Sequence, residues 1–422
     1  MSFIFVFLYD AGIRFYLLGI SVSSLWKSKA SQWRKGRENL LAVIQNTLIP
    51  GQERVWFHCA SAGEFEQGRP VIEAYRKRFP GQKIVLTFFS PSGFELRKNY
   101  SGADYIFYLP IDTRANAKKF LSLVDPKLVV FIKYEYWFHF ISEIIRRKIP
   151  IVFISVAARK KHPLFNPWML PLKKVVSASN RIFVQDLFSL QLFRNNGFEN
   201  AELAGDTRFD RVSEIASIPG SVHVIETFKN GRKLLVAGST WPRDEQLIFE
   251  LAGYLDDEWS LVVVPHEISS TNLIKLQKHL NRPVIIYSQA EEGKEITQEK
   301  ILIVDRSGLL SRIYQYADIA YIGGGFGKGI HNTLEPAAFG IPVIFGPNYE
   351  RFAEAKLLIE NGGGKSIRNT EELKNAFDFY LLKENHALGQ MNREWVQAET
   401  GATAKIMNYL AQLNSNNVAS PE

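Results

Sequence analysis

The sequence predicts an α/β protein made of two doubly wound, Rossmann-like domains, each built around a parallel sheet. From residue 53 onward, short and continuously apolar runs alternate with amphipathic stretches, which is typical of parallel strands covered by helices on both faces. The alternation stops at about 210–230 and then restarts. The chain has 422 residues, which is too long for one ordinary core and favours two domains.

The first half supplies the N-terminal domain, which we place at residues 41–215 after a separate segment at 1–40. Its expected strands are 54–60, 83–89, 104–110, 128–133, 151–156, 181–185 and 201–206. Its expected helices are 65–79, 91–100 and 136–148, with a further helical stretch before the fourth strand.

The second half supplies the C-terminal domain, which we place at residues 216–422. Its expected strands are 233–239, 260–266, 283–288, 300–305, 319–325 and 342–347. Its expected helices are 242–255, 308–316, 351–361, 371–382 and 387–412, the last of which is a candidate to cross back to the first domain. Doubly wound sheets bind ligands outside the carboxyl ends of their strands, so we expect the site in the cleft between the domains.

The N-terminal segment combines apolar and basic residues in an order that indicates a membrane surface. Apolar runs at 3–9 and 15–20 surround Asp10 and Arg14, and a basic stretch at 27–37 follows. A signal peptide has the opposite order, and two central charges make a transmembrane helix marginal. A helix lying on an anionic membrane surface fits better. The alternative is a core helix packed on the first domain.

The overall charge and the single cysteine limit the partners. The formal net charge is +8, which favours an anionic partner such as nucleic acid, anionic lipid or a phosphorylated substrate. No nucleic-acid-binding motif accompanies it, so we do not expect a nucleic-acid partner. Cys59 is the only cysteine, so the chain has no internal disulfide and no cysteine zinc site. Without an Asp-x-Asp or histidine-rich cluster, we expect no metal site and no cofactor.

A glycine-rich stretch, YIGGGFGKGIHNTLEP, follows an apolar strand in the second half. Gly323, Gly324 and Gly325 allow close approach of the backbone, and their N–H groups are candidates to hold a phosphate or carboxylate. A helix is expected to begin near Asn332 or Thr333, and its N-terminus favours anions. Glu335 in its first turn is suited to bind sugar hydroxyls. The alternative is a tight turn followed by a capped helix.

A second stretch, HCASAGEFEQGRP, places a carboxylate at the start of a helix. Glu64 follows a small-residue loop after the first strand. The N-terminus of the helix should help to keep this carboxylate ionised, as a general base requires. The alternative is that Glu64 or Glu66 only caps the helix.

Four further motifs follow strand ends. Glu135 in KYEYW is a second candidate carboxylate, or pairs with Lys133 or Arg208. Arg208 in GDTRFD is a candidate phosphate ligand or half of an interdomain ion pair. Ser239 and Thr240 in AGSTWPRDE suit a phosphate or serve as helix caps. His266 in VVVPHE lines a base pocket or lies on the surface.

Together these motifs resemble one family. ASAGEFEQGRPVI, TFFSPSGFE, YLPID, KYEYW, GDTRFD, GSTWPRDE, VVPHE and GGGFGKGIHNTLEPAAFGIPVIFGPNYERFAEA occur in one order. This order resembles the 3-deoxy-D-manno-octulosonic acid (Kdo) transferases of Gram-negative lipopolysaccharide synthesis, from about residue 3 to about residue 410.

The resemblance implies a glycosyltransferase fold of the GT-B type and an inverting transfer of Kdo from CMP-Kdo to a lipid A precursor (lipid IVA). It places the reaction at the cytoplasmic face of the inner membrane and implies no metal requirement. It makes Glu64 the general base and Glu135 a second catalytic carboxylate. It implies an acceptor side at Ser61, Gly63 and Arg69. The donor side would comprise Arg208, Ser239, Thr240, Pro265, His266, Gly323, Gly324, Gly325, Asn332 and Glu335.

The chain departs from the family pattern at several motifs. Trp-Phe-His at 137–139 replaces Trp-Pro-Asn, and Ser-Thr-Trp at 239–241 replaces Ser-Thr-His. The arginine of Asn-Ala-Arg-x-Ser is absent, and Arg159 or Lys161 is a candidate to substitute for it. These changes concern the acceptor and the number of sugars added more than the reaction. Two alternatives stay open: a GT-B enzyme with a UDP-sugar donor and another lipid acceptor, or a non-catalytic binding protein, which the intact Glu64, Asn332 and Glu335 argue against.

Overall fold

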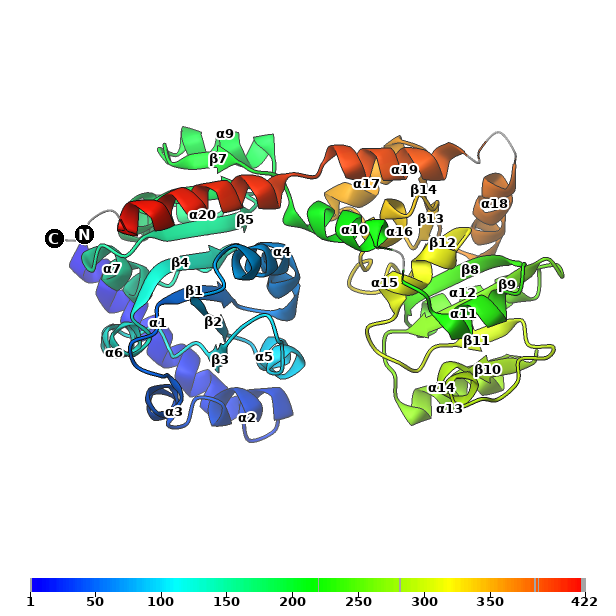
Figure 1. Cartoon of the computed structure of the whole chain (residues 1–422), viewed down its shortest axis with the longest axis horizontal. Coiled ribbons are helices and arrows are strands. Elements are labelled where there is room, and N and C mark those ends of the chain that lie inside the picture. The colour runs from blue at the N-terminus through cyan, green and yellow to red at the C-terminus, as the bar shows by residue number, and fades with distance from the viewer. Residues whose placement is uncertain (1, 219, 281, 383–384, 386, 419–422) are drawn as a thin grey trace. The chain divides into compact units, whose positions relative to one another are not determined.

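The computed structural model describes residues 2–218, 220–280, 282–382, 385 and 387–418. The chain forms two compact units, one of Met1–Asp210 with Thr400–Glu422 and the other of Arg211–Glu399 (Figure 1). Each unit holds one seven-stranded sheet, in which all the strand pairs are parallel. The predicted pair of doubly wound α/β domains is therefore confirmed.

The N-terminal sheet has the strand order β3-β2-β1-β4-β5-β6-β7. Its strands are β1 (Arg54–Cys59), β2 (Lys83–Phe88), β3 (Tyr105–Tyr108), β4 (Pro126–Ile132), β5 (Ile151–Val156), β6 (Arg181–Val184) and β7 (Ala201–Leu203). The helices of this unit are α1 (Ser2–Ser23), α2 (Ser28–Lys35), α3 (Leu40–Thr47), α4 (Ala62–Arg78), α5 (Pro91–Arg97), α6 (Arg114–Val124), α7 (Phe138–Arg146), η1 (Pro163–Phe165), η2 (Pro167–Met169), α8 (Leu170–Ser177), α9 (Leu187–Asn195) and α20 (Ala402–Val418). Helix α10 (Thr207–Ser217) crosses the boundary between the units.

The C-terminal sheet has the strand order β10-β11-β9-β8-β12-β13-β14. Its strands are β8 (Lys233–Thr240), β9 (Trp259–Pro265), β10 (Val284–Ile286), β11 (Ile301–Ile303), β12 (Ile319–Ile322), β13 (Val343–Phe345) and β14 (Gly364–Ser366). The helices of this unit are α11 (His223–Lys229), α12 (Pro242–Ala252), α13 (Ser270–His279), α14 (Tyr287–Glu291), α15 (Leu310–Ile313), η3 (Tyr314–Tyr316), α16 (Leu334–Ala338), α17 (Ala353–Glu360), α18 (Thr370–Leu381) and α19 (Ala387–Ala398).

The strands are apolar throughout because each sheet is covered on both faces. In β1, Val55 and Phe57 pack into one hydrophobic cluster, and Trp56 packs into the cluster on the opposite face. The same alternation divides β8, with Leu234 on one side and Leu235 on the other. A strand buried on both faces has no polar side to offer, which is why these segments read as continuous apolar runs.

The strand order of each sheet fixes where a ligand site is expected. The order reverses direction between β1 and β4 in the N-terminal sheet and between β8 and β12 in the C-terminal sheet. The carboxyl ends of two such neighbouring strands leave a crevice outside the sheet. The loops that follow β1, β4, β8 and β12 therefore lie at the topological switch points of their sheets.

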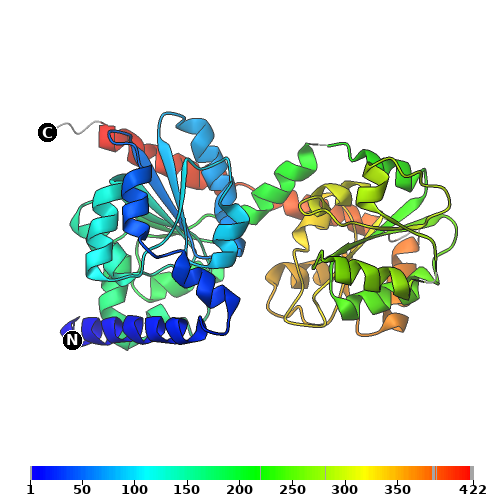
Figure 2. The ribbon, with the colours of Figure 1, turned by 90° about the horizontal axis from the view of Figure 1, so that it is seen from below.

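Helix α1 lies along one side of the N-terminal unit (Figure 2). Phe3–Ser23 is long and apolar enough to cross a membrane by length and composition. One face of the helix is nevertheless tied to the unit, because the Tyr9 hydroxyl donates to Asp112 Oδ2 over 2.5 Å. Asp10 pairs with His139 Nε2 at 2.6 Å. The other face exposes large apolar side chains: Phe3, Ile4, Phe7, Leu8, Phe15, Leu18 and Val22.

Several expected elements differ in detail. The expected helix 387–412 is two helices, α19 and α20, because Gly401 at φ +115° interrupts it. Asp210 accepts hydrogen bonds from the N–H groups of Gly401 and Thr403, each at 2.6 Å, and so caps the start of α20. The expected helix 308–316 shrinks to α15 and η3, and the short edge strand β14 was not predicted.

Candidate active site

The first candidate centre is the turn between β1 and α4, which carries Glu64. Ser61 is the N-cap of α4 and forms a capping box with Glu64. The Ser61 N–H donates to Glu64 Oε2 over 2.9 Å, and the Glu64 N–H donates to Ser61 Oγ over 3.4 Å. The Glu64 carboxylate is thereby held at the carboxyl end of β1, so capping the helix and presenting a base are compatible roles.

Burial raises the pKa of the Glu64 carboxyl above its ordinary value, and the nearby Glu135 carboxylate raises it further. His58, the Ser61 N–H and Lys133 act in the opposite direction, with smaller effects. The N-terminus of the helix favours the ionised form, because the Ser61 N–H lowers the pKa of Glu64, but the effect of burial is larger. A carboxylate with a raised pKa is a stronger base, which suits proton abstraction near neutral pH.

Glu135 lies in the loop after β4 and is oriented by two ring nitrogens. Trp137 Nε1 donates to Glu135 Oε2 over 2.7 Å, and His58 Nε2 lies 3.2 Å from the same oxygen. The Glu135 side chain is 11% exposed and His58 is fully buried. These partners come from neighbouring strand ends at the switch point of the sheet.

A chain of hydrogen bonds extends from Glu135 into the core. Trp56 Nε1 donates to Thr87 Oγ1 over 2.7 Å, and Thr87 Oγ1 lies 2.8 Å from His58 Nδ1. His58 Nδ1 also lies 3.1 Å from the Thr87 carbonyl oxygen, and Trp137 Nε1 lies 3.2 Å from His58 Nε2. These contacts hold the His58 ring between Thr87 and Glu135. No role was predicted for His58, because its partners Thr87 and Glu135 are remote in sequence.

The remaining N-terminal candidates have local partners. Arg208 pairs with Asp206, and its Nε and a terminal nitrogen lie 2.8 and 2.7 Å from the same oxygen, Oδ2. Arg69 pairs with Glu73 at 2.8 Å and with Glu66 at 3.8 Å. Gly63 is exposed, and an added Cβ would meet only Ser61 Oγ, at 4.0 Å. Packing therefore does not require glycine at position 63.

The second candidate centre is the glycine-rich turn after β12, where three backbones pack together. A Cβ on Gly323 would lie 2.3 Å from the carbonyl oxygen of Ser239. A Cβ on Gly324, which has φ +92°, would lie 2.6 Å from the carbonyl oxygen of Gly329, and one on Gly325 would lie 2.6 Å from Gly346 Cα. Side chains are absent here because the turn packs against β8 and the end of β13.

Two N–H groups of this turn are already engaged. The Gly323 N–H donates to the Gly238 carbonyl over 2.9 Å. The Gly324 N–H donates to Asp244 Oδ2 over 2.8 Å. The expectation that these two groups are free to hold an anion is therefore wrong.

Asp244 in α12 organises the turn and was missed from the sequence. Its Oδ2 also accepts from the Trp241 N–H over 2.9 Å, and its Oδ1 accepts from the Tyr321 hydroxyl over 2.7 Å. Burial raises the pKa of the Asp244 carboxyl, although all three donors lower it. The one side chain thus joins β8, β12 and α12.

An aromatic stack stands beside the turn. The rings of Trp241 and His266 stack at 4.5 Å, and those of His266 and His331 stack at 4.7 Å. Trp241 Nε1 donates to His331 Nε2 over 3.0 Å. Burial and the neighbouring His266 lower the pKa of His331 to about 4, so its Nε2 remains an acceptor at neutral pH. Pro265, directly before His266, ends β9.

The last donor-side candidates complete the local geometry. Asn332 Nδ2 donates to Glu335 Oε1 over 3.1 Å, and Asn332 Oδ1 accepts from the Leu334 N–H over 3.1 Å. Glu335 stands in the first turn of α16, as predicted. Thr240 is buried and its hydroxyl donates to Glu245 Oε1 over 3.3 Å. Ser239 has φ +54°, a strained value for a residue with a side chain.

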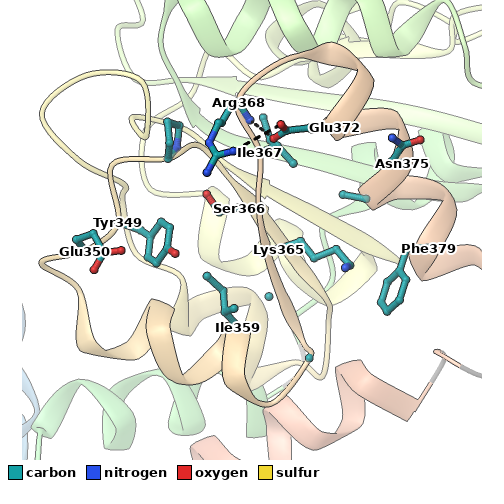
Figure 3. Close-up of a pocket in the computed structure, with 14 residues that line it drawn as sticks. Tyr349, Glu350, Ile359, Lys365, Ser366, Ile367, Arg368, Glu372, Asn375 and Phe379 are labelled. Atoms are coloured by element: carbon teal, nitrogen blue, oxygen red, sulfur yellow. Dashed lines mark hydrogen bonds and ion pairs between the residues drawn. The ribbon is translucent and has the colours of Figure 1, made fainter.

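The structure contains two pockets of similar volume, and only the first is lined by residues of a candidate centre. A pocket of about 700 Å³ in the N-terminal unit is lined in part by Glu135 and Trp137. A pocket of about 670 Å³ in the C-terminal unit lies beside β14 and α18 (Figure 3). In the second pocket, Lys365 Nζ lies 3.8 Å from the centre of the Phe379 ring. None of the predicted site residues line that second pocket.

Comparisons with known proteins identify relatives along most of the chain. A family model described as 3-Deoxy-D-manno-octulosonic-acid transferase (kdotransferase) matches residues 29–211. The chain is 26% identical over 406 residues to the 3-deoxy-D-manno-octulosonic acid transferase of Haemophilus influenzae, covering 92% of this chain and 94% of that protein. It is 28% identical over 379 residues to the protein of the same name from Rickettsia typhi, covering 88% and 80%.

Solved structures show the same fold at low sequence identity. The UDP-GlcNAc 2-epimerase of Neisseria meningitidis matches with a TM-score of 0.58 at 16% identity, covering 85% of this chain and all of that one. A putative UDP-N-acetylglucosamine 2-epimerase from Listeria monocytogenes matches with a TM-score of 0.57 at 15% identity, covering 86% and 96%. With the two parallel sheets, these matches confirm the predicted GT-B type of fold.

Proposed function

We propose that the protein transfers Kdo in lipopolysaccharide synthesis, because the 3-deoxy-D-manno-octulosonic-acid transferase family model matches residues 29–211. The donor is CMP-Kdo, and the acceptor is an acylated, phosphorylated glucosamine disaccharide such as lipid IVA. The observation that carries the proposal is the position of Glu64. It stands at the switch point of the matched domain, where burial and Glu135 raise its pKa.

In the proposed reaction, Glu64 removes the proton from a hydroxyl group of the acceptor sugar. The resulting oxygen attacks the anomeric carbon of Kdo, the bond from that carbon to the CMP phosphate breaks, and the configuration inverts. The proton stays on Glu64 until solvent removes it. Glu135, fixed by His58 and Trp137, supplies the negative field that strengthens the base.

The C-terminal unit is proposed to bind the donor near the ends of β8, β9 and β12. The Trp241–His266–His331 stack offers an aromatic surface for a base. Glu335, paired with Asn332, is suited to accept hydrogen bonds from ribose hydroxyls. Ser239 and Arg208 stay candidates for the phosphate and carboxylate of the donor.

Membrane association is proposed to occur through α1. Its outward face is apolar, and the following segment carries Lys27, Lys29, Arg34 and Lys35. Since Tyr9 and Asp10 hold the opposite face against the N-terminal unit, a position along the surface of the bilayer accommodates both faces. We place the protein at the cytoplasmic face of the inner membrane.

The test is a transfer assay with CMP-Kdo, generated in situ by its synthetase, and a tetra-acylated lipid A precursor. Product masses give the number of sugars added, and one arm receives EDTA only after the CMP-Kdo has been formed, because a metal requirement of the transferase is not expected. We expect Kdo transfer by the wild type with and without EDTA. A folded protein that binds CMP without transfer would redirect the search to another acceptor. Absence of both CMP binding and transfer would overturn the donor assignment and favour a UDP-sugar.

A further inference from the structure

The N-terminal unit holds an apolar pocket of about 700 Å³ beside the second carboxylate. One wall is formed by Tyr9 and Ile13 of α1, and another by Glu135 and Trp137 of the loop after β4. The segment between β5 and α8 and the start of α8 close it with mostly apolar side chains: Ala157, Pro163, Leu164, Met169 and Leu172. We propose that this pocket binds one acyl chain of the phosphorylated lipid acceptor. The inference rests on the proposed function.

The wall contributed by α1 is fixed in place. The Tyr9 hydroxyl donates to Asp112 and accepts from the Phe138 N–H over 3.3 Å. The rings of Tyr9 and Phe138 lie 5.7 Å apart. These contacts hold α1 as part of the pocket, so the same helix borders the pocket and exposes its apolar face.

That double role gives a hydrocarbon chain a continuous apolar path. Phe7, Leu8 and Phe15 are exposed on the outward face of α1, whereas Tyr9 and Ile13 face the pocket. A chain leaving a bilayer on which α1 lies therefore stays against apolar surface as it enters. Moving the chain through water instead would expose its methylene groups.

Charge at the pocket rim matches an anionic lipid. Arg159 and Lys161 line the pocket and are exposed, and Lys160 between them is exposed as well. An acceptor phosphate beside these side chains would be paired with a cation. His162, also in the wall, has its pKa lowered by burial and adds no charge at neutral pH.

The position of Glu135 ties the pocket to the reaction centre. Glu135 lines the pocket and lies near enough to Glu64 to raise its pKa. An acceptor whose sugar hydroxyl reaches Glu64 therefore has this pocket as adjacent apolar space. Anchoring one chain there would position the sugar for attack.

The first test is photo-crosslinking of the full chain in detergent micelles. The probe is a bisphosphorylated, tetra-acylated glucosamine disaccharide with a diazirine at the end of one acyl chain. We expect adducts in peptides that contain residues 134–137 and 157–172. Ala157→Phe, which fills the pocket, should reduce these adducts about tenfold, whereas the matched Ala115→Phe at an exposed position of α6 should not. Adducts confined to the outward face of α1 would overturn the proposal.

Transfer kinetics separate this proposal from the proposed function. Ala157→Phe should raise KM about tenfold for the acylated acceptor and leave kcat/KM for the deacylated disaccharide unchanged. Ile13→Trp, which fills the pocket from α1, should repeat the result if Ala157→Phe folds poorly. An equal loss on both acceptors would contradict the pocket. Specific adducts without Kdo transfer would support the acyl-chain pocket and contradict the proposed function. Kdo transfer without specific adducts would support the proposed function and contradict the pocket.

Discussion

His58 Nε2 lies 3.2 Å from Glu135 Oε2, and it connects the second carboxylate to the core of the N-terminal sheet. The other ring nitrogen of His58 contacts the Thr87 hydroxyl, which in turn accepts from Trp56. These contacts restrict the orientation of the Glu135 carboxylate, so it is better positioned for the reaction than a carboxylate on an unrestrained side chain.

Replacing His58 tests this orientation. His58→Phe keeps a ring that packs against Phe131 at 5.4 Å and removes the ring nitrogen that contacts Glu135. We expect kcat for Kdo transfer to fall about tenfold with KM little changed. Thr87→Ser, which keeps the hydroxyl, is the matched control and should stay near the wild type. A rise in KM alone would contradict the orientation of Glu135 by His58.

Glu64→Gln should abolish the base while keeping the helix cap, since glutamine also completes a capping box. The expected loss in kcat is about 10²–10⁴-fold, measured with CMP-Kdo and the acylated acceptor. Glu95→Gln, at an exposed pair with Lys98, controls for the loss of a surface carboxylate. Retained activity in Glu64→Gln, with an unchanged melting temperature in both variants, would remove Glu64 from the mechanism.

The pH profile tests the coupling of the two carboxylates. A general base works deprotonated, so kcat/KM rises with pH through the pKa of Glu64 in the free enzyme. Glu135 raises that pKa, and Glu135→Gln removes its charge. We expect the acid limb of the profile to move to lower pH in Glu135→Gln, whatever happens to the maximal rate. An unmoved limb would mean that another group sets it.

Asp244 should be important for the glycine-rich turn. Asp244→Ala leaves the N–H groups of Gly324 and Trp241 and the Tyr321 hydroxyl without their acceptor. The expected cost is about 3 kcal/mol in the free energy of unfolding, measured by urea titration. Asp244→Asn keeps an oxygen for the two N–H groups and should cost less. If amide hydrogen exchange at Gly324 is faster in Asp244→Ala but not in Asp244→Asn, the loss of stability lies in the glycine-rich turn.

His331 should make the stability of the C-terminal unit depend on pH. Its pKa is about 4 in the folded chain, below the ordinary 6.5, so the unfolded chain binds a proton first as the pH falls. The stabilising contribution is therefore complete above pH 6.5 and is lost as the pH falls from 6.5 towards 4. His331→Gln should flatten this decline in thermal melts, and His223→Gln, at an exposed position, should not. Parallel declines in all three proteins would refute the assignment.

The fold was largely predictable because both sheets are buried on both faces, which leaves long apolar runs in the sequence. Strand β14, Gly364–Ser366, was missed because it is short and lacks such a run. The break at Gly401 was not predicted, because the residue that caps the following helix, Asp210, is 191 residues away. Local pattern does not report a partner at that distance.

The candidate site was predictable where a motif marks a strand end. Glu64, Asn332 and Glu335 stand at helix starts, as expected. His58 and Asp244 were missed because their roles come from partners that only the folded sheets bring together, 77 residues away for Glu135 and 80 for Gly324. The N–H groups of Gly323 and Gly324 were expected to hold an anion, but they donate to Gly238 and Asp244, which are remote in sequence.

Helix α20 closes the N-terminal unit with residues from the far end of the chain. Ile406, Met407 and Leu410 are buried with Phe57 and Tyr75 in one cluster, and α20 packs on α4, the helix that begins beside Glu64. During synthesis on a ribosome, the face of the first unit that α20 covers therefore stays exposed until the whole second unit has emerged. Helix α4, which carries Glu64 in its first turn, therefore gains this packing partner only late in translation.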